Sequence, residues 1–78
     1  MNFTYNLGKN IKLKLERGIG FENVIELIEK DRYSIAKITS ENHAGQKCFI
    51  VKYNGKYWIV PFKEYTTKIH LFTIFKKD

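Results

Sequence analysis

The chain has 78 residues, so we expect one small domain, residues 1–78, and such a domain buries only about 60% of the surface that its unfolded form exposes. So thin a core leaves little room for a deep pocket. Fourteen Lys and Arg residues against eight Asp and Glu residues give a net charge of +6, which favours anionic partners such as nucleic acid or an acidic protein. The longest apolar stretch, residues 57–62, is far shorter than the roughly 20 residues of a membrane-spanning helix, and residues 1–6 contain no signal-peptide hydrophobic region, so we expect a cytoplasmic protein without a membrane partner.

The single cysteine and the two histidines limit the chemistry of any site. Cys48 has no partner for an internal disulfide, and no Cys or His residues stand at the spacing of zinc ligands. Because Cys48 lies in the apolar run CFIV, a buried thiol is a commoner interpretation than a nucleophile. We therefore expect neither a metal site nor a cofactor.

The first elements are a short strand and a basic helix. Phe3 and Tyr5 alternate with polar residues, which predicts a strand with one buried face. From Leu7 the period changes, because Leu7, Ile11 and Leu15 recur every four residues while lysines occupy the other faces. This pattern predicts a short, basic, amphipathic helix.

Two glycines predict a corner between this helix and a second one. Gly18 follows the last periodic residue, where a helix commonly ends in the left-handed conformation. Gly20 suits the N-cap of the next helix, and Ile19 and Val24 then form a hydrophobic staple. The second helix is expected to run to about Lys30 with an acidic exposed side. Its apolar stripe consists of Phe21, Val24, Ile25 and Ile28.

Strands follow the helices. Residues 33–39 alternate as a strand does, and residues 40–45 are turn formers. Asn54-Gly55 between residues 47–53 and 56–61 predicts a hairpin with a type I′ turn. The expected cross-strand pairs are Val51 with Trp58, Phe49 with Val60 and Ile50 with Ile59.

The end of the hairpin and the remaining strand complete the predicted fold. Both faces of the hairpin are apolar, so helices are expected to cover one face, and a partner or the chain termini part of the other. Pro61 cannot donate to a ladder, so it either ends its strand or lies at an edge. A last strand covers residues 68–75. The order β-α-α-β-β-β-β predicts an α+β domain, with two N-terminal helices packed on a mostly antiparallel sheet of four to five strands.

Several short motifs together resemble the BrnT-like toxins of bacterial type II toxin–antitoxin modules, over most of the chain. They are Lys9-Asn10, Glu16-Arg17-Gly18-Ile19, Phe21-Glu22, Gly45-Gln46 and Val60-Pro61-Phe62. The resemblance implies a RelE-like fold, a small ribonuclease, and an antitoxin that blocks the toxin and commonly binds the operator.

The chain departs from the family pattern at two places. Gly20 stands where relatives usually have a serine, at a cost of only a few tenths of a kcal/mol because glycine caps nearly as well. After Ile74 the chain lacks the family's Ser-Arg segment and late tyrosine. This second departure favours an alternative function, a non-catalytic module of the same fold that binds nucleic acid or protein.

Metal-free RNA cleavage requires a proton acceptor for the 2′-hydroxyl, a proton donor for the departing 5′-oxygen and cations around the phosphate. The candidates for proton transfer are His43 in the loop and His70 in the last strand, since histidine titrates near neutral pH. Arg17 could hold phosphate at the end of the basic helix. A solvated or hydrogen-bonded structural role is the alternative for each histidine, and an interaction with the helix C-terminus is the alternative for Arg17.

Basic and aromatic residues supply the predicted RNA-binding surface. Its candidates are Lys9, Lys12, Arg17, Lys47, Lys63, Lys76 and Lys77. Tyr53, Tyr57 and Trp58 could stack on unpaired bases, although core packing is the commoner role of such residues. Lysines beside strands also protect sheet edges and keep a protein soluble. This is the alternative role of Lys47, Lys63, Lys76 and Lys77.

The sequence thus favours a toxin that cleaves mRNA without metal or cofactor and is neutralised by a cognate antitoxin. RNA and the antitoxin are the expected partners. The sequence is compatible both with a homo-oligomer and with a toxin–antitoxin hetero-oligomer. We also expect the surplus lysines to gather on one side of the domain, where a polyanion would dock.

Overall fold

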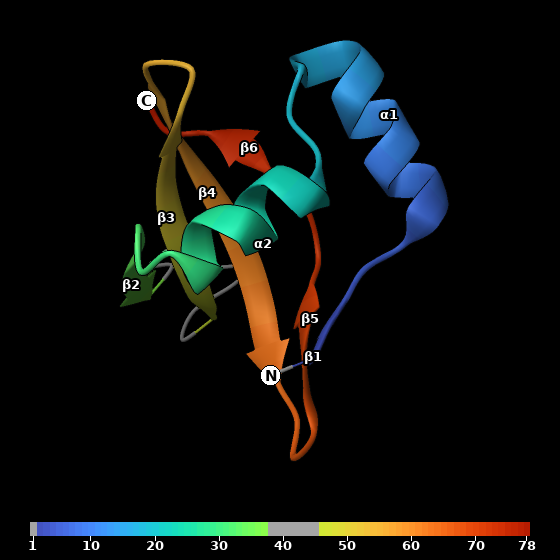
Figure 1. Cartoon of the computed structure of the whole chain (residues 1–78), viewed down its shortest axis with the longest axis vertical. Coiled ribbons are helices and arrows are strands. Elements are labelled where there is room, and N and C mark those ends of the chain that lie inside the picture. The colour runs from blue at the N-terminus through green and yellow to red at the C-terminus, as the bar shows by residue number, and fades with distance from the viewer. Residues whose placement is uncertain (1, 38–45) are drawn as a thin grey trace.

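The computed structural model describes residues 2–37 and 46–78, and it has an α+β fold (Figure 1). The elements are β1 (Asn2–Thr4), α1 (Leu7–Arg17), α2 (Phe21–Glu29), β2 (Ser34–Lys37), β3 (Lys47–Tyr53), β4 (Lys56–Glu64), β5 (Lys68–Leu71) and β6 (Phe75–Lys76). The predicted element order and the mostly antiparallel sheet are confirmed, but among the described residues the sheet has six strands rather than four or five. The predicted loop 40–45 and the last residues of the strand predicted over 33–39 lie outside the described residues.

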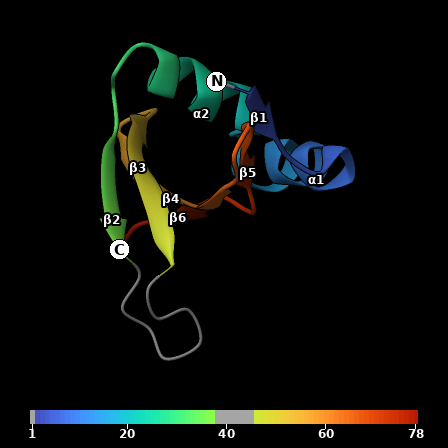
Figure 2. The ribbon, with the colours of Figure 1, turned by 90° about the horizontal axis from the view of Figure 1, so that it is seen from below.

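The sheet has the order β1-β5-β4-β3-β2, with β6 also beside β4. β1 pairs with β5 in parallel, with Asn2 opposite Lys68 and Thr4 opposite His70, while the other described pairs are antiparallel. The sheet is curved, and α2 lies across its concave side (Figure 2). None of the described helices is long and apolar enough to cross a membrane.

Helix α1 begins and ends at identifiable signals. The Asn6 side chain caps its N-terminus by accepting a hydrogen bond of 2.8 Å from the Lys9 backbone N–H. At the other end Gly18 has φ 71°, and its N–H donates to the Lys14 carbonyl at 3.1 Å. The predicted glycine stop is confirmed, while the Asn6 cap was not predicted.

The corner between the helices depends on a buried asparagine. Asn10, on α1, is only 6% exposed, and its Oδ1 accepts a hydrogen bond of 2.7 Å from the Phe21 N–H. Its amide nitrogen donates to Glu22. Asn23 completes the cap, because its Oδ1 accepts from the Gly20 N–H at 2.9 Å. Gly20 is therefore the N-cap of α2 as predicted, but the side chain that binds the first free N–H comes from α1.

The same geometry explains why residue 20 is a glycine. A Cβ atom there would lie 2.6 Å from Cε of Lys14 and 3.0 Å from Oδ1 of Asn10. The serine that relatives usually have at this position would displace both side chains, so the steric fit favours glycine here although serine is the slightly stronger N-cap. The predicted staple residues Ile19 and Val24 are both fully buried in the core.

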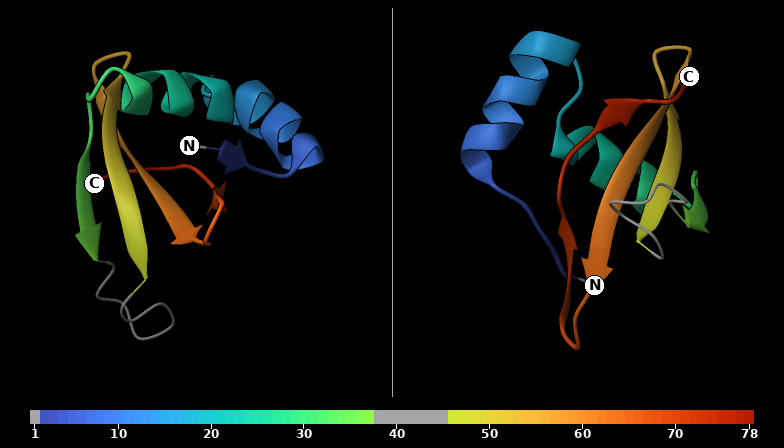
Figure 3. Two further views of the ribbon diagram at one scale, coloured as in Figure 1. Left: turned by 60° about the horizontal axis from the view of Figure 1, so that its bottom comes forward. Right: turned by 180° about the vertical axis from the view of Figure 1, so that it is seen from behind.

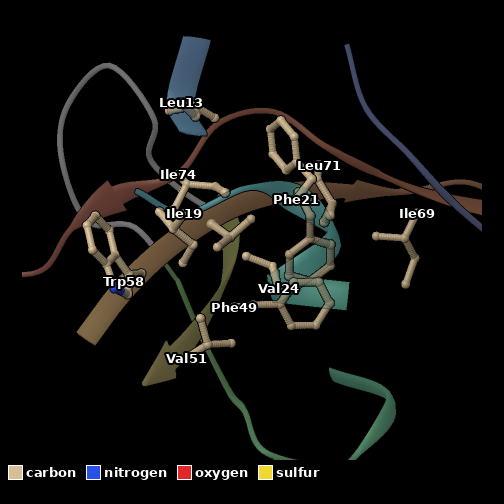
Figure 4. Packing of buried hydrophobic residues seen from close by; sticks show 12 residues of the cluster. Leu13, Ile19, Phe21, Val24, Phe49, Val51, Trp58, Ile69, Leu71 and Ile74 are labelled. Carbon is tan, nitrogen blue, oxygen red and sulfur yellow. The ribbon is translucent and has the colours of Figure 1, made fainter. Parts of the chain in front are cut away.

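Helix α2 supplies one side of the core. Phe21 and Val24 are fully buried, and Figure 4 shows them beside Phe49 of β3. Ile25 and Ile28, the other residues of the predicted stripe, are half-buried against the same cluster. The rings of Phe49 and Phe62 stack with centroids 4.0 Å apart, and those of Tyr5 and Phe21 with centroids 4.9 Å apart. The buried hydrophobic cluster comprises Leu13, Ile19, Phe21, Val24, Phe49, Val51, Trp58, Val60, Phe62, Ile69, Leu71 and Ile74.

Helix α1 does not pack through its predicted apolar stripe. Leu7, Ile11 and Leu15 are 71%, 61% and 83% exposed, and the buried residues of the helix are Asn10 and Leu13 on another face. The helix lies outside the curve of the sheet, beyond β5 and β1 (Figures 1 and 2). The expectation that both helices pack on the sheet is wrong for this stripe, because the contacts with α2 and the core use the face of Asn10 and Leu13.

The predicted hairpin is confirmed in turn and register. Asn54 and Gly55 have φ of 52° and 76°, as a type I′ turn requires. The observed pairs include Phe49 with Val60, Ile50 with Ile59 and Val51 with Trp58. On the convex face Ile50 and Ile59 are half-buried, and the C-terminal segment joins the sheet as β6 rather than covering that face.

The last predicted strand, residues 68–75, is divided by a bulge. Phe62 pairs with Leu71 but Ile59 pairs with Phe75, so one extra residue lies in the segment between β5 and β6 (Figure 3). Pro61 faces this segment, since its carbonyl accepts from the Phe72 N–H at 2.9 Å and the N–H and C=O of one residue point to the same neighbouring strand. Pro61 therefore does not end β4. The backbone N–H that a proline lacks would point to the segment just after the end of β5, where the ladder is already interrupted.

Candidate nucleic-acid interface

Three of the predicted RNA-binding residues line one shallow groove along α1. Lys9, Lys12 and Arg17 lie on its walls, and its volume is about 330 Å³. Thr73, from the bulged segment between β5 and β6, also lines it. The remaining lining residues are Gly8, Leu13 and Glu16. We call this the α1 groove; its three cations suit a phosphate, and Glu16 is its one acidic lining residue.

Arg17 joins this groove to the sheet. Its Nη1 donates a hydrogen bond to the backbone carbonyl of Ile74, which is fully buried. The guanidinium has five N–H donors, so this contact fixes its position while other donors stay available for a phosphate. The alternative role of Arg17 was an interaction with the C-terminus of its own helix. The structure shows a related contact, because Arg17 binds a backbone carbonyl, but this carbonyl belongs to Ile74 in the bulged segment.

His70 does not line the α1 groove. It lies on the convex face of the sheet, because its neighbours Ile69 and Leu71 are buried on the concave side and successive residues of a strand alternate. Its Nδ1 is 2.8 Å from Oγ1 of Thr4, and its half-buried ring meets the Phe72 ring edge-on at 5.1 Å. The hydrogen bond to Thr4 holds the ring in one orientation.

Two lysines and a tyrosine accompany His70 at the end of the β4–β5 hairpin. The Nζ atoms of Lys63 and Lys68 lie 5.4 Å and 5.2 Å from the centroid of the Tyr65 ring. Lys63 is directly opposite His70 in the ladder, so their side chains share a face. Lys68 precedes His70 by two residues and lies on that face too. We call Lys63, Tyr65, Lys68 and His70 the hairpin-end cluster.

Sequence reasoning found Lys63 and His70 but missed Tyr65 and Lys68. The signal was present in the spacing, since Lys68 and His70 share the period of two of one strand. The turn that brings Tyr65 against both lysines was not predicted. It is closed by a hydrogen bond of 2.8 Å from the Tyr65 N–H to the Lys68 carbonyl.

The other predicted site residues lie elsewhere. Lys47, on β3, is 3.8 Å from Glu64 Oε1 and so has a carboxylate partner within the protein. Lys76 lies opposite Trp58 in β6, and the Lys77 N–H donates to the Tyr57 carbonyl. His43 lies outside the described residues. The structure thus brings together the lysines of α1 on one side and those of the β4–β5 hairpin on another.

Glu22 and Glu26 lie on the exposed side of α2. A hydrogen bond from Lys14, with Nζ 2.7 Å from Oε2, lowers the pKa of Glu22 against the opposing effect of burial. Glu26 likewise has a lowered pKa because Lys30 donates to it at 2.9 Å. Carboxylates held ionised on α2 repel polyanions, so the exposed side of α2 is a poor nucleic-acid surface.

The remaining candidates have structural roles. Cys48 is buried, which confirms the interpretation as a buried thiol, and its Sγ lies 3.5 Å from the Ala36 carbonyl. Burial raises the pKa of this thiol. Trp58 is buried and donates to the Tyr53 carbonyl at 3.1 Å, so it is not a stacking platform. Within residues 2–37 and 46–78 no group of His, Cys, Asp and Glu side chains is arranged to hold a metal ion.

Comparison with known proteins adds no assignment. No protein-family model matches the chain, and a search of curated proteins also gives no match.

Proposed function

We propose that this chain is a BrnT-like toxin, a metal-independent endoribonuclease that cleaves mRNA and is neutralised by a cognate antitoxin. The observation that carries the proposal is the hairpin-end cluster, in which a histidine and two lysines share one face of the sheet and both ammonium groups lie near the ring of an exposed tyrosine. The net charge of +6 and the motif resemblance support the same function.

His70 is the proton-transfer group in this proposal. Its Nδ1 is engaged by Thr4, which leaves Nε2 to meet the substrate. The 2′-oxygen of a ribose attacks the adjacent phosphorus and loses its proton to a base, while the P–O5′ bond breaks and the 5′-oxygen takes up a proton. An imidazole serves either proton transfer near neutral pH.

The lysines and the tyrosine have separate roles. Negative charge accumulates on the phosphate oxygens during the attack, and the ammonium groups of Lys63 and Lys68 stabilise it. The Tyr65 ring, which is partly exposed, offers a face on which a base can stack. The α1 groove supplies further phosphate contacts through Lys9 and Lys12.

A cleavage assay in EDTA tests the proposal. The purified chain is incubated with a labelled mRNA fragment, and His70→Gln is expected to lower the cleavage rate by at least about 100-fold while RNA affinity changes by less than about twofold. Lys63→Met and Lys68→Met are expected to lower both rate and affinity. The matched control is Lys56→Met, at the far end of β4, which leaves both unchanged. Cleavage that persists in His70→Gln contradicts the assignment of His70.

Contacts in the α1 groove are tested by salt dependence. Lys9→Met with Lys12→Met is expected to weaken RNA binding and to flatten the plot of log affinity against log salt by about one unit per lost phosphate contact. An unchanged slope places the RNA elsewhere.

A second candidate function is a non-catalytic RNA-binding module. The observation that favours it is that both described catalytic candidates already bond within the protein, His70 to Thr4 and Arg17 to the Ile74 carbonyl. Induced expression separates the two functions. Growth arrest with loss of mRNA, abolished by His70→Gln, supports the enzyme, whereas normal growth with intact transcripts and retained RNA binding supports the module. A small reading frame next to the gene would identify the antitoxin.

A further inference from the structure

The exposed side of α1 carries a feature that RNA binding does not use. Leu7, Ile11 and Leu15 stand at positions i, i+4 and i+8, so they form one continuous row along the helix, which we call the α1 ridge. All three are more than half exposed. Rows of this spacing are the ridges that fit between the side chains of a second helix when two helices pack.

The ridge is held in place before any partner binds. The opposite side of α1 is fixed to the domain by the buried Asn10 and Leu13, and by the hydrogen bond from Arg17 to the Ile74 carbonyl. The Asn6 cap and the Gly18 stop set the two ends of the helix. A partner therefore meets a preformed surface and does not have to order it, which lowers the entropic cost of docking.

Charge selects the chemistry of the partner. Helix α1 carries Lys9, Lys12, Lys14 and Arg17 against Glu16, four cations and one anion, which gives a net charge of +3. Lys12 and Lys14 lie on either side of the ridge, since they are one residue from Ile11 and Leu15 and so about 100° around the helix. Lys14 also pairs with Glu22 of α2 at 2.7 Å, so Lys12 is the stronger candidate for a carboxylate of the partner. We propose that the α1 ridge docks an acidic amphipathic helix of a partner protein, with leucine-like side chains against the ridge and carboxylates beside the lysines.

The observations favour this occupant over two others. Two copies of α1 placed side by side would bring two helices of charge +3 together, so a second copy of the chain is disfavoured. A lipid surface would gain only three apolar side chains from a helix of 11 residues, which is a weak anchor. A protein helix satisfies both the apolar row and the flanking charges.

The inference goes beyond RNA cleavage, because Leu7, Ile11 and Leu15 belong neither to the hairpin-end cluster nor to the lining of the α1 groove, and only the flanking Lys12 is shared with the proposed RNA contacts. Binding to the ridge can therefore fail while His70 remains essential, and the reverse can also hold. The two experiments thus fail independently.

Two synthetic peptides test the ridge with the full chain. Both have leucines at i, i+4 and i+8, one with glutamates on the flanking positions and the other with lysines in their place. In fluorescence anisotropy the glutamate peptide is expected to bind, and the lysine peptide at least 10-fold more weakly. Ile11→Gln with Leu15→Gln, which keeps good helix formers, is expected to weaken binding of the glutamate peptide at least 10-fold. Tyr57→Ser, which changes an exposed apolar residue on β4, leaves it unchanged and is the matched control.

Each other outcome overturns the proposal. Equal binding of both peptides, or binding unaffected by the ridge substitutions, removes the role of α1. Co-sedimentation with vesicles of phosphatidylserine and phosphatidylcholine, lost in the ridge variant and without peptide binding, assigns the ridge to a lipid surface. A dimer in light scattering that becomes a monomer in the ridge variant assigns it to a second copy. Circular dichroism confirms that the variants keep the native helix content.

Discussion

The two helices of this domain are adjacent in sequence and differ in what their apolar residues contact. Helix α2 buries Phe21 and Val24 in the core and turns its carboxylates outward, whereas α1 leaves Leu7, Ile11 and Leu15 exposed and carries lysines around them. Both patterns predict a helix equally well. The comparison teaches that periodicity identifies an apolar face but does not tell whether the domain itself covers it.

The largest expected effect is a difference in the free energy of unfolding between substitutions on the two apolar faces. Phe21→Ala removes a fully buried ring and is expected to lower the free energy of unfolding by about 3–5 kcal/mol, measured by urea denaturation. The matched change on α1, Leu15→Ala, is expected to alter it by less than about 0.5 kcal/mol because the side chain is solvated. A large loss in Leu15→Ala would show that the domain does cover the α1 ridge.

Asn10 connects the two helices, so its removal tests whether they act as one unit. Asn10→Ala leaves the Phe21 N–H without its acceptor and is expected to cost about 2–3 kcal/mol of unfolding free energy. Asn6→Ala is a matched control of the same chemistry on an exposed cap, with an expected cost of about 1 kcal/mol. Equal costs for the two variants would mean that the buried bond adds nothing beyond capping.

Gly20 tests the space between the helices. Gly20→Ser places a Cβ against Lys14 and Asn10 and is expected to destabilise the domain by about 1 kcal/mol, even though serine is the better N-cap. The cost is at the low end for overpacking because the Lys14 side chain can move. Thermal and urea unfolding measure it, and a more stable serine variant would contradict the steric explanation.

The smallest expected effect concerns the ion pair between the helices. The folded pKa of Glu22 is lowered chiefly by Lys14, so the pair stabilises the domain above the carboxyl's ordinary pKa and loses this contribution as the pH falls through the lowered value. Both side chains are about half exposed, so Lys14→Met is expected to cost no more than about 0.5 kcal/mol at pH 7. Urea midpoints of the two proteins should converge as the pH falls below 4.5; a constant difference would exclude the ion pair as its cause.

Much of the fold followed from local signals. Gly18 stops α1, and Asn54-Gly55 sets a two-residue turn from which the register of β3 and β4 follows, because each signal acts on its immediate neighbours. The parallel pairing of β1 with β5 and the bulge opposite Pro61 did not follow. They depend on contacts between segments far apart in the chain.

The candidate site was predictable only in part. The types and spacing of Lys9, Lys12 and Arg17 indicated a basic helix, and the structure places them around one groove. Tyr65 became recognisable only when a turn brought it between Lys63 and Lys68. The buried role of Asn10 was hidden because a polar residue on a basic helix is expected to be solvated.

The parallel pairing of β1 with β5 sets an order for folding during synthesis. Asn2 lies opposite Lys68, so β1 must wait for the synthesis of 66 further residues before its partner strand exists, roughly 3–13 s at ordinary elongation rates. Until then the edge of β1 has no partner, while the local β3–β4 hairpin can already close. β1 is thus paired long after the β3–β4 hairpin can close, and a nascent chain stays open along that seam until β5 has been synthesised.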